Sequence, residues 1–130
     1  MSIVRRMVAG ACALLATAGI AVVGAPTASA AVEGANRCVR VSVDYTRTGP
    51  TSWNVASASV ANNCGPFYGH FQLKGPTFDF SNPDSQSAVG FTAPLNQTWY
   101  GAAPYVCGTA WFKVTPSYWT DYGFVCVTLV

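Results

Sequence analysis

The sequence YVCGTAWFKVTPSYWTDYGFVCVTLV, residues 105–130, decides the fold. Apolar residues alternate with other residues from Val106 to Val114 and again from Val125 to Leu129. This is the period-two pattern of strands with one buried face. The intervening segment PSYWTDYG, residues 116–123, contains turn-forming residues. We therefore predict one β-hairpin with its turn region at 116–123.

The two cysteines of this hairpin favour the same register as its apolar residues. Cys107 and Cys126 lie equally far from the middle of the connection, at 116–117. A hairpin folded there places the two cysteines opposite each other and Val106 opposite Val127. Both cysteines then lie on the face away from the valines, because side chains alternate along a strand. Two independent patterns thus predict the disulfide Cys107–Cys126.

Residues 1–30 have the pattern of a secretory signal peptide that is cleaved from the mature chain. Arg5 and Arg6 give a positive start, an apolar run follows at 8–23, and residues 28–30 (ASA) form an A-x-A cleavage site. The run is shorter than the roughly 20 residues that a membrane span needs, so no span is expected after cleavage. The surroundings of the arginine pair fit general secretion better than the twin-arginine route. We expect a secreted bacterial protein.

The mature chain, residues 31–130, is predicted to be a single domain without net charge. It contains five basic and five acidic side chains, so the formal charge of +2 of the whole chain belongs to the two arginines of the signal peptide. A chain without a basic patch lacks the attraction that brings proteins to nucleic acids and anionic membranes. We therefore expect neither of these as a partner.

Four cysteines lie in the mature chain, and an even number in an exported chain predicts disulfides. We favour the sequential pairs Cys38–Cys64 and Cys107–Cys126 over the other two connectivities, because the members of each pair are nearly equidistant from a turn. The chain-entropy model assigns roughly 3–3.5 kcal/mol to each closed loop. Zinc sites usually contain close pairs such as C-x-x-C, which this spacing does not provide, so no metal or cofactor is expected.

The first hairpin is less well determined than the last. Its strands are predicted at 38–47, where valines alternate with polar residues, and at 53–64. Placing the two cysteines directly opposite each other pairs Val41 with an alanine. A slip of one residue pairs Val41 with Val60 instead and exchanges the faces. A bulge near residues 62–63 would satisfy both the disulfide and the valines.

Short segments divided by glycine, proline and asparagine account for the rest of the mature chain. Residues 31–37 are expected to be a frayed polar lead-in, and further strands are expected at 67–74, 77–81, 88–93 and 97–102. Helical spacing is absent from the mature chain. The predicted fold class is therefore all-β: a small disulfide-stapled antiparallel β-sandwich or barrel of about seven short strands.

Residues suited to catalysis are sparse in this sequence. The single histidine, His70, lies with Gln72 on the polar side of a predicted strand, where a surface or structural histidine is expected. The sequence has no Gly-x-Ser-x-Gly turn to project a nucleophile. Asp79 and Asp84 flank a predicted turn, but a domain of this size has little room for a cleft between paired carboxylates. With the cysteines bridged, no thiol remains, and we expect a protein that is not an enzyme.

All seventeen aromatic residues lie in the mature chain. The phenylalanines expected in the core are Phe71, Phe78, Phe80, Phe91, Phe112 and Phe124. Tryptophans and tyrosines gather near predicted turns, among them Trp53, Tyr118 and Trp119. If the two hairpin turns lie together, these three rings form an exposed platform with Asp121 or Arg47 at its edge. The alternative is that the rings cap the ends of the sandwich and that each polar atom finds a backbone partner.

These observations favour a non-catalytic binding or inhibitory module that presents aromatic hairpin loops to an extracellular protein or to a polysaccharide or other glycan. A self-associating structural protein of the cell envelope is the alternative, suggested by the near-zero net charge. A small secreted hydrolase that uses His70 and an aspartate is the second alternative.

Overall fold

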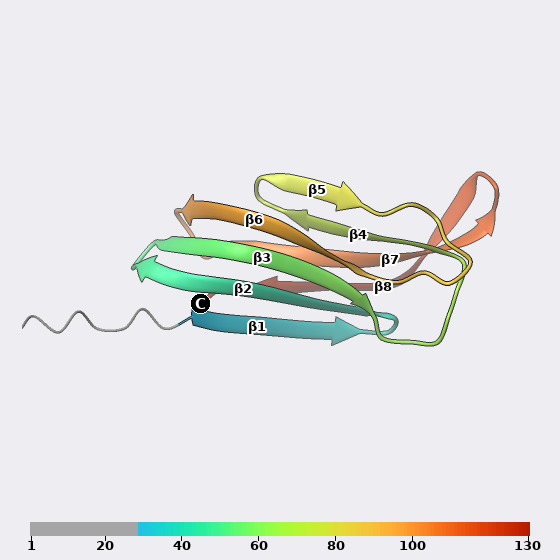
Figure 1. Ribbon diagram of the computed structural model, residues 1–130, viewed down its shortest axis with the longest axis horizontal. Helices are drawn as coiled ribbons and strands as arrows, with labels where there is room; N and C mark the ends of the chain where they lie inside the picture. Colours follow the sequence, from blue (N-terminus) through green and yellow to red (C-terminus); the bar gives the residue numbers. More distant parts are fainter. Residues whose placement is uncertain (1–28) are drawn as a thin grey trace, which may run out of the picture.

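Alternating apolar and polar residues form eight antiparallel strands in two four-stranded sheets, which face each other as a β-sandwich (Figure 1). The computed structural model describes residues 29–130. The expected all-β class and the sandwich are confirmed, with eight strands in place of about seven. The described residues include no helix that is long and apolar enough to cross a membrane.

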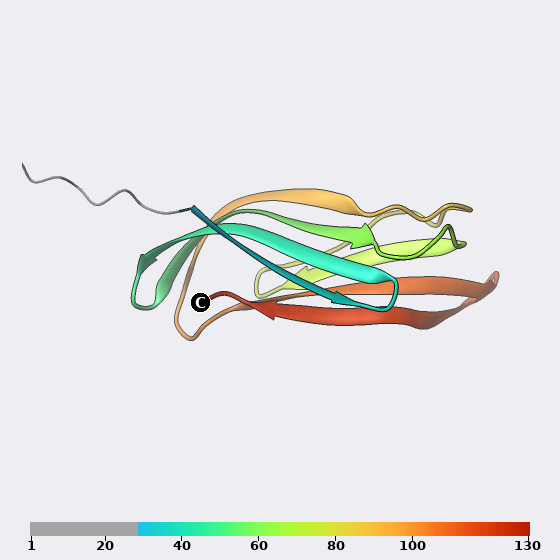
Figure 2. The ribbon, with the colours of Figure 1, turned by 90° about the horizontal axis from the view of Figure 1, so that it is seen from below.

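The first sheet has the strand order β1-β2-β3-β6. Its strands are β1 (Ser29–Asn36), β2 (Val39–Gly49), β3 (Ser52–Asn62) and β6 (Phe91–Tyr100). The second sheet has the order β5-β4-β7-β8. Its strands are β4 (Gly69–Gly75), β5 (Phe78–Ser81), β7 (Tyr105–Thr115) and β8 (Tyr118–Thr128). Figure 2 shows that the β7–β8 hairpin reaches one end of the molecule.

The core lies between the two sheets. Val41 and Val43 of β2 and Phe71 and Leu73 of β4 are completely buried there. The sheets approach closely at Gly108 of β7, where a Cβ atom would lie 2.3 Å from Cγ2 of Val41. Because side chains alternate along a strand, burial of one face of β4 and β7 turns their polar and indole-bearing positions outward.

The β7–β8 hairpin has the predicted register and disulfide. Cys107 pairs with Cys126, and Val106 pairs with Val127. The valines are buried against the first sheet, so the bridge Cys107–Cys126 lies on the outer face. Disulfide and apolar pattern agree here, as the sequence indicates.

The turn of this hairpin is shorter than predicted. Pro116 and Ser117 alone separate the two strands, and residues 118–123 belong to β8. Aromatic and β-branched residues in that segment favour a strand, which extends the pairing almost to the tip. A register shift between Ala110 and Trp111 interrupts the ladder, and such bulges increase the local twist.

The β2–β3 hairpin adopts the slipped register. Val41 pairs with Val60, which brings the apolar residues of both strands to the buried face. The backbone N–H of Asn63 donates to the carbonyl oxygen of Cys38 at 3.0 Å, and Cys64 follows one residue later. The bridge Cys38–Cys64 is present. The pairing thus keeps one register up to Asn63, and the bulge predicted near residues 62–63 is not found, because the register shifts of this strand pair lie between Asp44 and Tyr45 and between Arg47 and Gly49.

The segment expected as a frayed lead-in, residues 31–37, is a strand in all but its last residue. It belongs to β1, which pairs with β2 along its whole length. The alanines and glycine of the segment hide the alternation in the sequence. Packing against β8 is tight, because a Cβ atom at Gly34 would lie 2.8 Å from Cγ1 of Val127.

The predicted signal peptide falls largely outside the described residues, which begin at Ser29. Its last two residues, Ser29 and Ala30, form the start of β1 and pair with Thr46 and Tyr45. Cleavage after Ala30 would remove these two pairs and leave the other six pairs of β1 with β2 in place.

The two short strands expected at 88–93 and 97–102 are corrected to one strand, β6. This strand continues past Pro94 and past Asn96, whose φ angle is 47°. β6 lies at the edge of its sheet, where a proline is tolerated because one side of the strand needs no ladder partner. Asparagine adopts the left-handed region more readily than most residues.

Only part of the expected phenylalanine core is buried. Four of the six expected phenylalanines lie in or against the core, namely Phe71, Phe78, Phe91 and Phe112, and Phe67, which was not among the six, is buried there as well. Phe80 and Phe124 are 44% and 48% exposed, which corrects the prediction for both. Phe124 pairs with Thr109 on the outer face. Phe80 lies on the short edge strand β5, where its ring stacks on that of Phe78 with centroids 5.3 Å apart.

Candidate functional site

The predicted platform of three rings does not form, because its two hairpin turns lie apart. Figures 1 and 2 both show the β2–β3 turn and the β7–β8 turn at opposite ends of the molecule. Tyr118 and Trp119 start β8 at one end, whereas Trp53 and Arg47 lie beside the β2–β3 turn at the other. The two hairpins belong to different sheets. The sequence of one hairpin does not indicate at which end of the sandwich its turn lies relative to the turn of the other.

Trp53 and Trp99 instead close the β2–β3 end of the core. They pair across β3 and β6 and are 2% and 5% exposed. The guanidinium of Arg47 lies 5.8 Å from the centroid of the Trp53 ring. The capping alternative is thus correct for these rings, but not for all their polar atoms. Nε1 of Trp99 donates to the side chain of Gln97 at 3.2 Å, whereas the buried Nε1 of Trp53 has no partner in residues 29–130.

The carboxylate of Asp121 is hydrogen-bonded within its own strand. Its Oδ1 accepts a hydrogen bond from the backbone N–H of Gly123 at 2.6 Å, and the residue pairs with Trp111 at the register shift. Gly123 packs against the β1–β2 turn, since a Cβ atom there would lie 2.7 Å from the carbonyl oxygen of Asn36. Asp121 therefore helps to shape the bulge beside Trp111.

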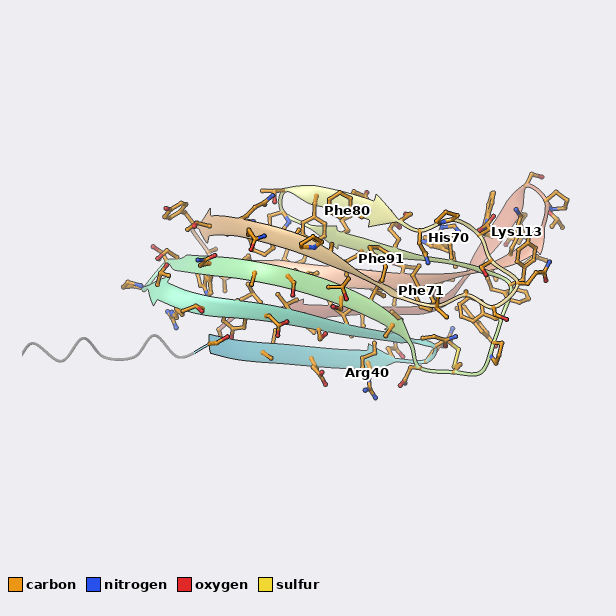
Figure 3. The ribbon with its side chains drawn as sticks, viewed as in Figure 1. Arg40, His70, Phe71, Phe80, Phe91 and Lys113 are labelled. Carbon is orange, nitrogen blue, oxygen red and sulfur yellow. A yellow bond between two sulfur atoms is a disulfide. The ribbon has the colours of Figure 1, made fainter. Side chains whose placement is uncertain are left out.

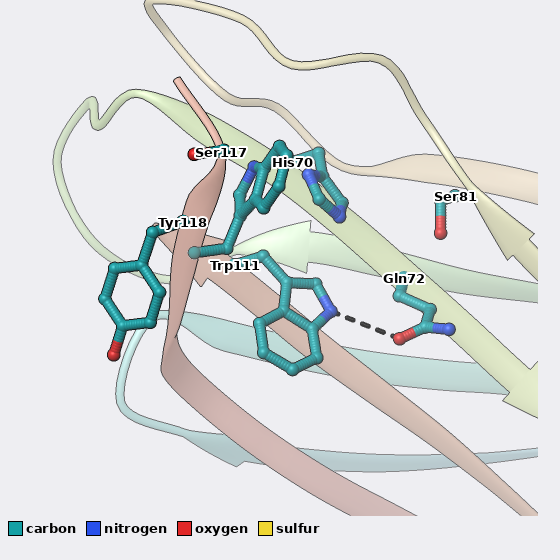
Figure 4. Close-up of a pocket in the computed structure, with 7 residues that line it drawn as sticks. His70, Gln72, Ser81, Trp111, Ser117 and Tyr118 are labelled. Carbon is teal, nitrogen blue, oxygen red and sulfur yellow. Dashed lines mark hydrogen bonds between the residues drawn. The ribbon is translucent and has the colours of Figure 1, made fainter. Parts of the chain in front are cut away.

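An open depression of about 470 Å³ lies on the outer face of the second sheet, near the β7–β8 turn (Figure 4). Pairing of β4 with β7 brings His70 opposite Trp111, although these residues are far apart in sequence. We call this feature the tip depression. It is lined by His70, Gln72, Ser81, Trp111, Ser117, Tyr118 and Trp119.

The carboxylate of Asp84 joins three side chains at the rim of the tip depression. It accepts hydrogen bonds from Nζ of Lys113 at 2.7 Å and from Nε1 of Trp119 at 3.1 Å. Nδ1 of His70 lies 2.7 Å from the same carboxylate. We call these four residues the Asp84 cluster. Figure 3 shows His70 and Lys113 toward the end of the molecule that carries the β7–β8 turn.

The backbone holds the loop that carries Asp84 against β4. The N–H of Ser85 donates to the carbonyl oxygen of Gly69 at 2.8 Å, and the N–H of Gly69 donates back to Ser85 at 3.0 Å. The side chain of Asn82 accepts from the N–H of Phe71 at 2.7 Å. These three hydrogen bonds, at residues on either side of Asp84, hold it in place, and through its carboxylate Asp84 fixes the β7–β8 tip.

Both charged members of the Asp84 cluster are ionised at neutral pH. Hydrogen bonds from Lys113 and then from His70 lower the pKa of Asp84 to about 2. The hydrogen bond to Asp84 in turn raises the pKa of Lys113 above its ordinary value. The ammonium of Lys113 also lies 4.9 Å from the ring centroid of Trp119 and 5.4 Å from that of Tyr68. One negative and one positive charge thus cancel at hydrogen-bond distance.

The second indole of the tip depression is held from the neighbouring strand. Nε1 of Trp111 donates to Oε1 of Gln72 at 3.1 Å, and Nε2 of Gln72 donates to Asp79 at 2.7 Å. Figure 4 shows the hydrogen bond and the indole of Trp111 spread across the view between Tyr118 and Gln72. The indole N–H groups of Trp111 and Trp119 are therefore both hydrogen-bonded within the protein. A ligand can contact only the faces and the carbon edges of these two rings.

Comparison with protein-family models, with curated proteins and with solved structures finds no match to this chain. The arrangement of side chains is therefore the guide to function. In the described part of the chain, no three histidine, cysteine, aspartate or glutamate residues gather as a metal site would require. Asp79 and Asp84, considered above as a carboxylate pair, each have other partners: Asp79 contacts Gln72 and Lys74, and Asp84 has its cluster.

Of the residues that line the tip depression, the sequence indicates Tyr118 and Trp119 as binding residues and His70 only as part of the hydrolase alternative, and it does not single out the others as site residues. A usable signal was present, because alternation places Trp111 on the outward face of β7 and places His70 and Gln72 on the outward face of β4. The pairing of β4 with β7 brings these faces together. No pattern within either strand indicates that they are neighbours.

Proposed function

We propose that this protein is an exported, non-catalytic binding module whose ligand, an extracellular protein or glycan, docks in the tip depression. The observation that supports the proposal is a pair of indoles, Trp111 and Trp119, held in place by hydrogen bonds beside the exposed ring of Tyr118. Two disulfides in a chain of this size are compatible with an extracellular location.

Binding at this site would be favoured by rigidity. A ligand gains affinity when the groups that contact it do not have to be ordered on binding. The rings of Trp111 and Trp119 are anchored to Gln72 and Asp84, and these anchors stand on hydrogen-bonded strands or tethered loops. Tryptophan and tyrosine are also the residues that most often dominate the energy of an interface.

Replacement of Trp111 by alanine is expected to weaken ligand binding at least about tenfold, since loss of an aromatic anchor commonly removes more than about 1.4 kcal/mol. The measurement is retention of extracellular proteins and polysaccharides on the immobilised, exported protein. Tyr100→Ala is the matched control, because Tyr100 is 79% exposed and follows Trp99 at the opposite end of the molecule. Equal retention by Trp111→Ala and wild type would contradict the proposal.

A hydrolase is the second candidate, and one observation favours it. His70 and Asp84 form the aspartate–histidine half of a catalytic triad, with Nδ1 of His70 2.7 Å from the carboxylate. Ser81 and Ser117 line the same depression. Two features of the Asp84 cluster support the binding module over the hydrolase. Asp84 also accepts hydrogen bonds from Lys113 and Trp119, and no described serine is hydrogen-bonded to His70.

The two candidates differ in what His70→Ala does to ester hydrolysis. For a binding module we expect wild type and His70→Ala to hydrolyse nitrophenyl esters at the same background rate. A general base contributes about 10²–10⁴-fold to a rate, so a true hydrolase would lose at least that factor. A wild-type rate well above background that disappears in His70→Ala would establish the hydrolase in place of the binding module.

A further inference from the structure

Resting on the proposed function, we infer that the ligand of the tip depression is a neutral, hydroxyl-rich glycan. Three properties of the depression support this class of ligand: its cancelled charge, its indole faces and its free hydroxyl groups.

The charge of the depression does not suit an anionic ligand. Lys113 belongs to the Asp84 cluster, and its ammonium lies 2.7 Å from the carboxylate of Asp84 with only 16% of the side chain exposed. Lys74, further along β4, lies 3.7 Å from Asp79. Recognition of a carboxylate, sulfate or phosphate uses charge-assisted hydrogen bonds from an available cation. Within residues 29–130, each lysine of this sheet has a carboxylate partner, and the pair at the depression, Lys113 with Asp84, is the closer and less exposed of the two.

The aromatic groups suit the carbon–hydrogen face of a sugar ring. An aromatic ring is negative on its face, and it attracts the C–H groups of a pyranose, which the neighbouring oxygens make slightly positive. Trp111 has its only polar atom occupied by Gln72, so its remaining surface is apolar. Tyr118, which is 56% exposed, stands beside it at the wall of the depression.

Unused polar groups stand next to these rings. Ser81 and Ser117 line the depression and are exposed, and neither hydroxyl is hydrogen-bonded to another described side chain. A hydroxyl both donates and accepts, as do the hydroxyls of a sugar. In neutral His70, donation from Nδ1 to Asp84 leaves Nε2 as an acceptor on the same side. A flat apolar floor with donors and acceptors at its rim matches a sugar ring, which is apolar on its faces and polar at its edges.

The size of the depression agrees with a glycan better than with a protein. Its volume of about 470 Å³ falls in the range of about 300–1,000 Å³ that is usual for small ligands. A stable protein interface buries about 800 Å² on each partner. Beside the depression the outer face carries the paired polar side chains of Lys74 and Asp79, with Phe124 as an exposed ring further across the sheet.

The experiment is electrophoresis of the exported protein through native gels that contain one polysaccharide each. The neutral set is β-glucan, galactomannan and dextran, with pull-down on insoluble cellulose and chitin. The anionic set is polygalacturonate and dextran sulfate. We expect retention by at least one neutral polysaccharide and none by the anionic set. Retention should persist when NaCl is raised to about 1 M, where the Debye length is about 3 Å.

Variants separate the role of each group. Trp111→Ala should weaken retention at least about tenfold, and Ser81→Ala about threefold to tenfold, the effect of one net hydrogen bond. Ser59→Ala is the matched control and should leave retention unchanged, because Ser59 lies on the first sheet and bonds to Thr92. Retention by a neutral polysaccharide that Ser81→Ala and Ser59→Ala weaken equally would overturn the assignment to this depression.

Failure of this inference differs from failure of the proposed function. Retention by anionic polysaccharides that salt abolishes, or by none of the named polysaccharides, would overturn the neutral glycan. Binding of an extracellular protein that Trp111→Ala abolishes would also overturn it, yet would leave the binding module standing. Binding of every ligand unchanged in Trp111→Ala would remove the proposed function itself.

Discussion

A variant with alanine at positions 38, 64, 107 and 126 should be largely unfolded at room temperature. The two bridges close loops with sequence separations of 26 and 19 residues, and the chain-entropy model assigns roughly 3–3.5 kcal/mol to each. The loops do not overlap in sequence, so their contributions add to about 6–7 kcal/mol. The net stability of a domain is about 5–15 kcal/mol, and loss of that amount would remove most or all of it. The measurement is unfolding in guanidinium chloride followed by tryptophan fluorescence.

The two single-bridge variants provide the control for this prediction. Each should remain folded with a free energy of unfolding lower by about 3 kcal/mol. Alanine is preferred to serine because Cys38 is buried, with 4% of its surface exposed, and a hydroxyl there would need a partner. A four-alanine variant with the same unfolding midpoint as the wild type would show that the two disulfides do not contribute to the stability of the domain.

Replacement of Asp84 by asparagine should lower the free energy of unfolding by about 2–3 kcal/mol. Hydrogen bonds to charged groups contribute about 1.5–3 kcal/mol, and removal of one partner of a part-buried ion pair leaves the other charge without compensation. The side chains of Asp84 and Lys113 are only 22% and 16% exposed. Release of Lys113 and Trp119 should also loosen the tip depression and weaken ligand binding. Unfolding in urea and binding by the same retention assay measure the two effects.

Asp79→Asn is the matched control. Asp79 also contacts a lysine on the same sheet, but the distance to Lys74 is 3.7 Å and the two side chains are 47% and 67% exposed. An exposed pair of this kind contributes at most about 1 kcal/mol. Equal losses in Asp84→Asn and Asp79→Asn would contradict a special role for the Asp84 cluster.

The pH dependence of stability should distinguish Asp84→Asn from the wild type in acid. The hydrogen bond from Lys113 is the main reason why the pKa of Asp84 falls to about 2, compared with about 3.9 in an unfolded chain. The stabilisation by this carboxylate is therefore complete above about pH 4 and is lost as the pH falls through about 2. Over that interval the wild type should lose stability more steeply than Asp84→Asn. The raised pKa of Lys113 affects stability only at alkaline pH. The stabilisation by the Lys113 ammonium is present at neutral pH and is lost as the pH rises through that raised pKa.

The last hairpin could be predicted in register because two patterns constrain it in the same way. A slip of one residue would separate Cys107 from Cys126 and turn Val106 and Val127 away from the core. The first hairpin shows what happens when the patterns disagree. The valines determine the register of β2 and β3, and the chain beyond β3 bends so that Cys64 still reaches Cys38.

Elements with weak side-chain signals could not be predicted correctly. β1 contains alanines and a glycine, and its strand conformation comes from pairing with β2 and from close packing of Gly34 against Val127. β6 contains Pro94 and Asn96, which look like turn residues. They are accommodated in one strand because β6 lies at the edge of its sheet.

The candidate site was predicted only where it lies within one hairpin. Clustering in the sequence identifies Tyr118 and Trp119, whereas the prediction that Trp53 joins them is wrong because the two turns emerge at opposite ends of the molecule. Trp111 and His70 become neighbours through the pairing of β4 with β7. Because β4 and β7 are far apart in the sequence, the alternation of residues within each strand does not indicate that the two strands pair.

The amino-acid sequence by itself determined the all-β class, the two disulfides and the side of each main strand that faces the core. These follow from alternation and from the spacing of cysteines about their turns, which are local properties of the chain. Only the tertiary structure decided which strands lie side by side, at which end each turn emerges, and that Asp84, His70, Lys113 and Trp119 meet. The physical reason is that these contacts depend on how two sheets pack over one core, and many strand orders would bury the same apolar faces equally well.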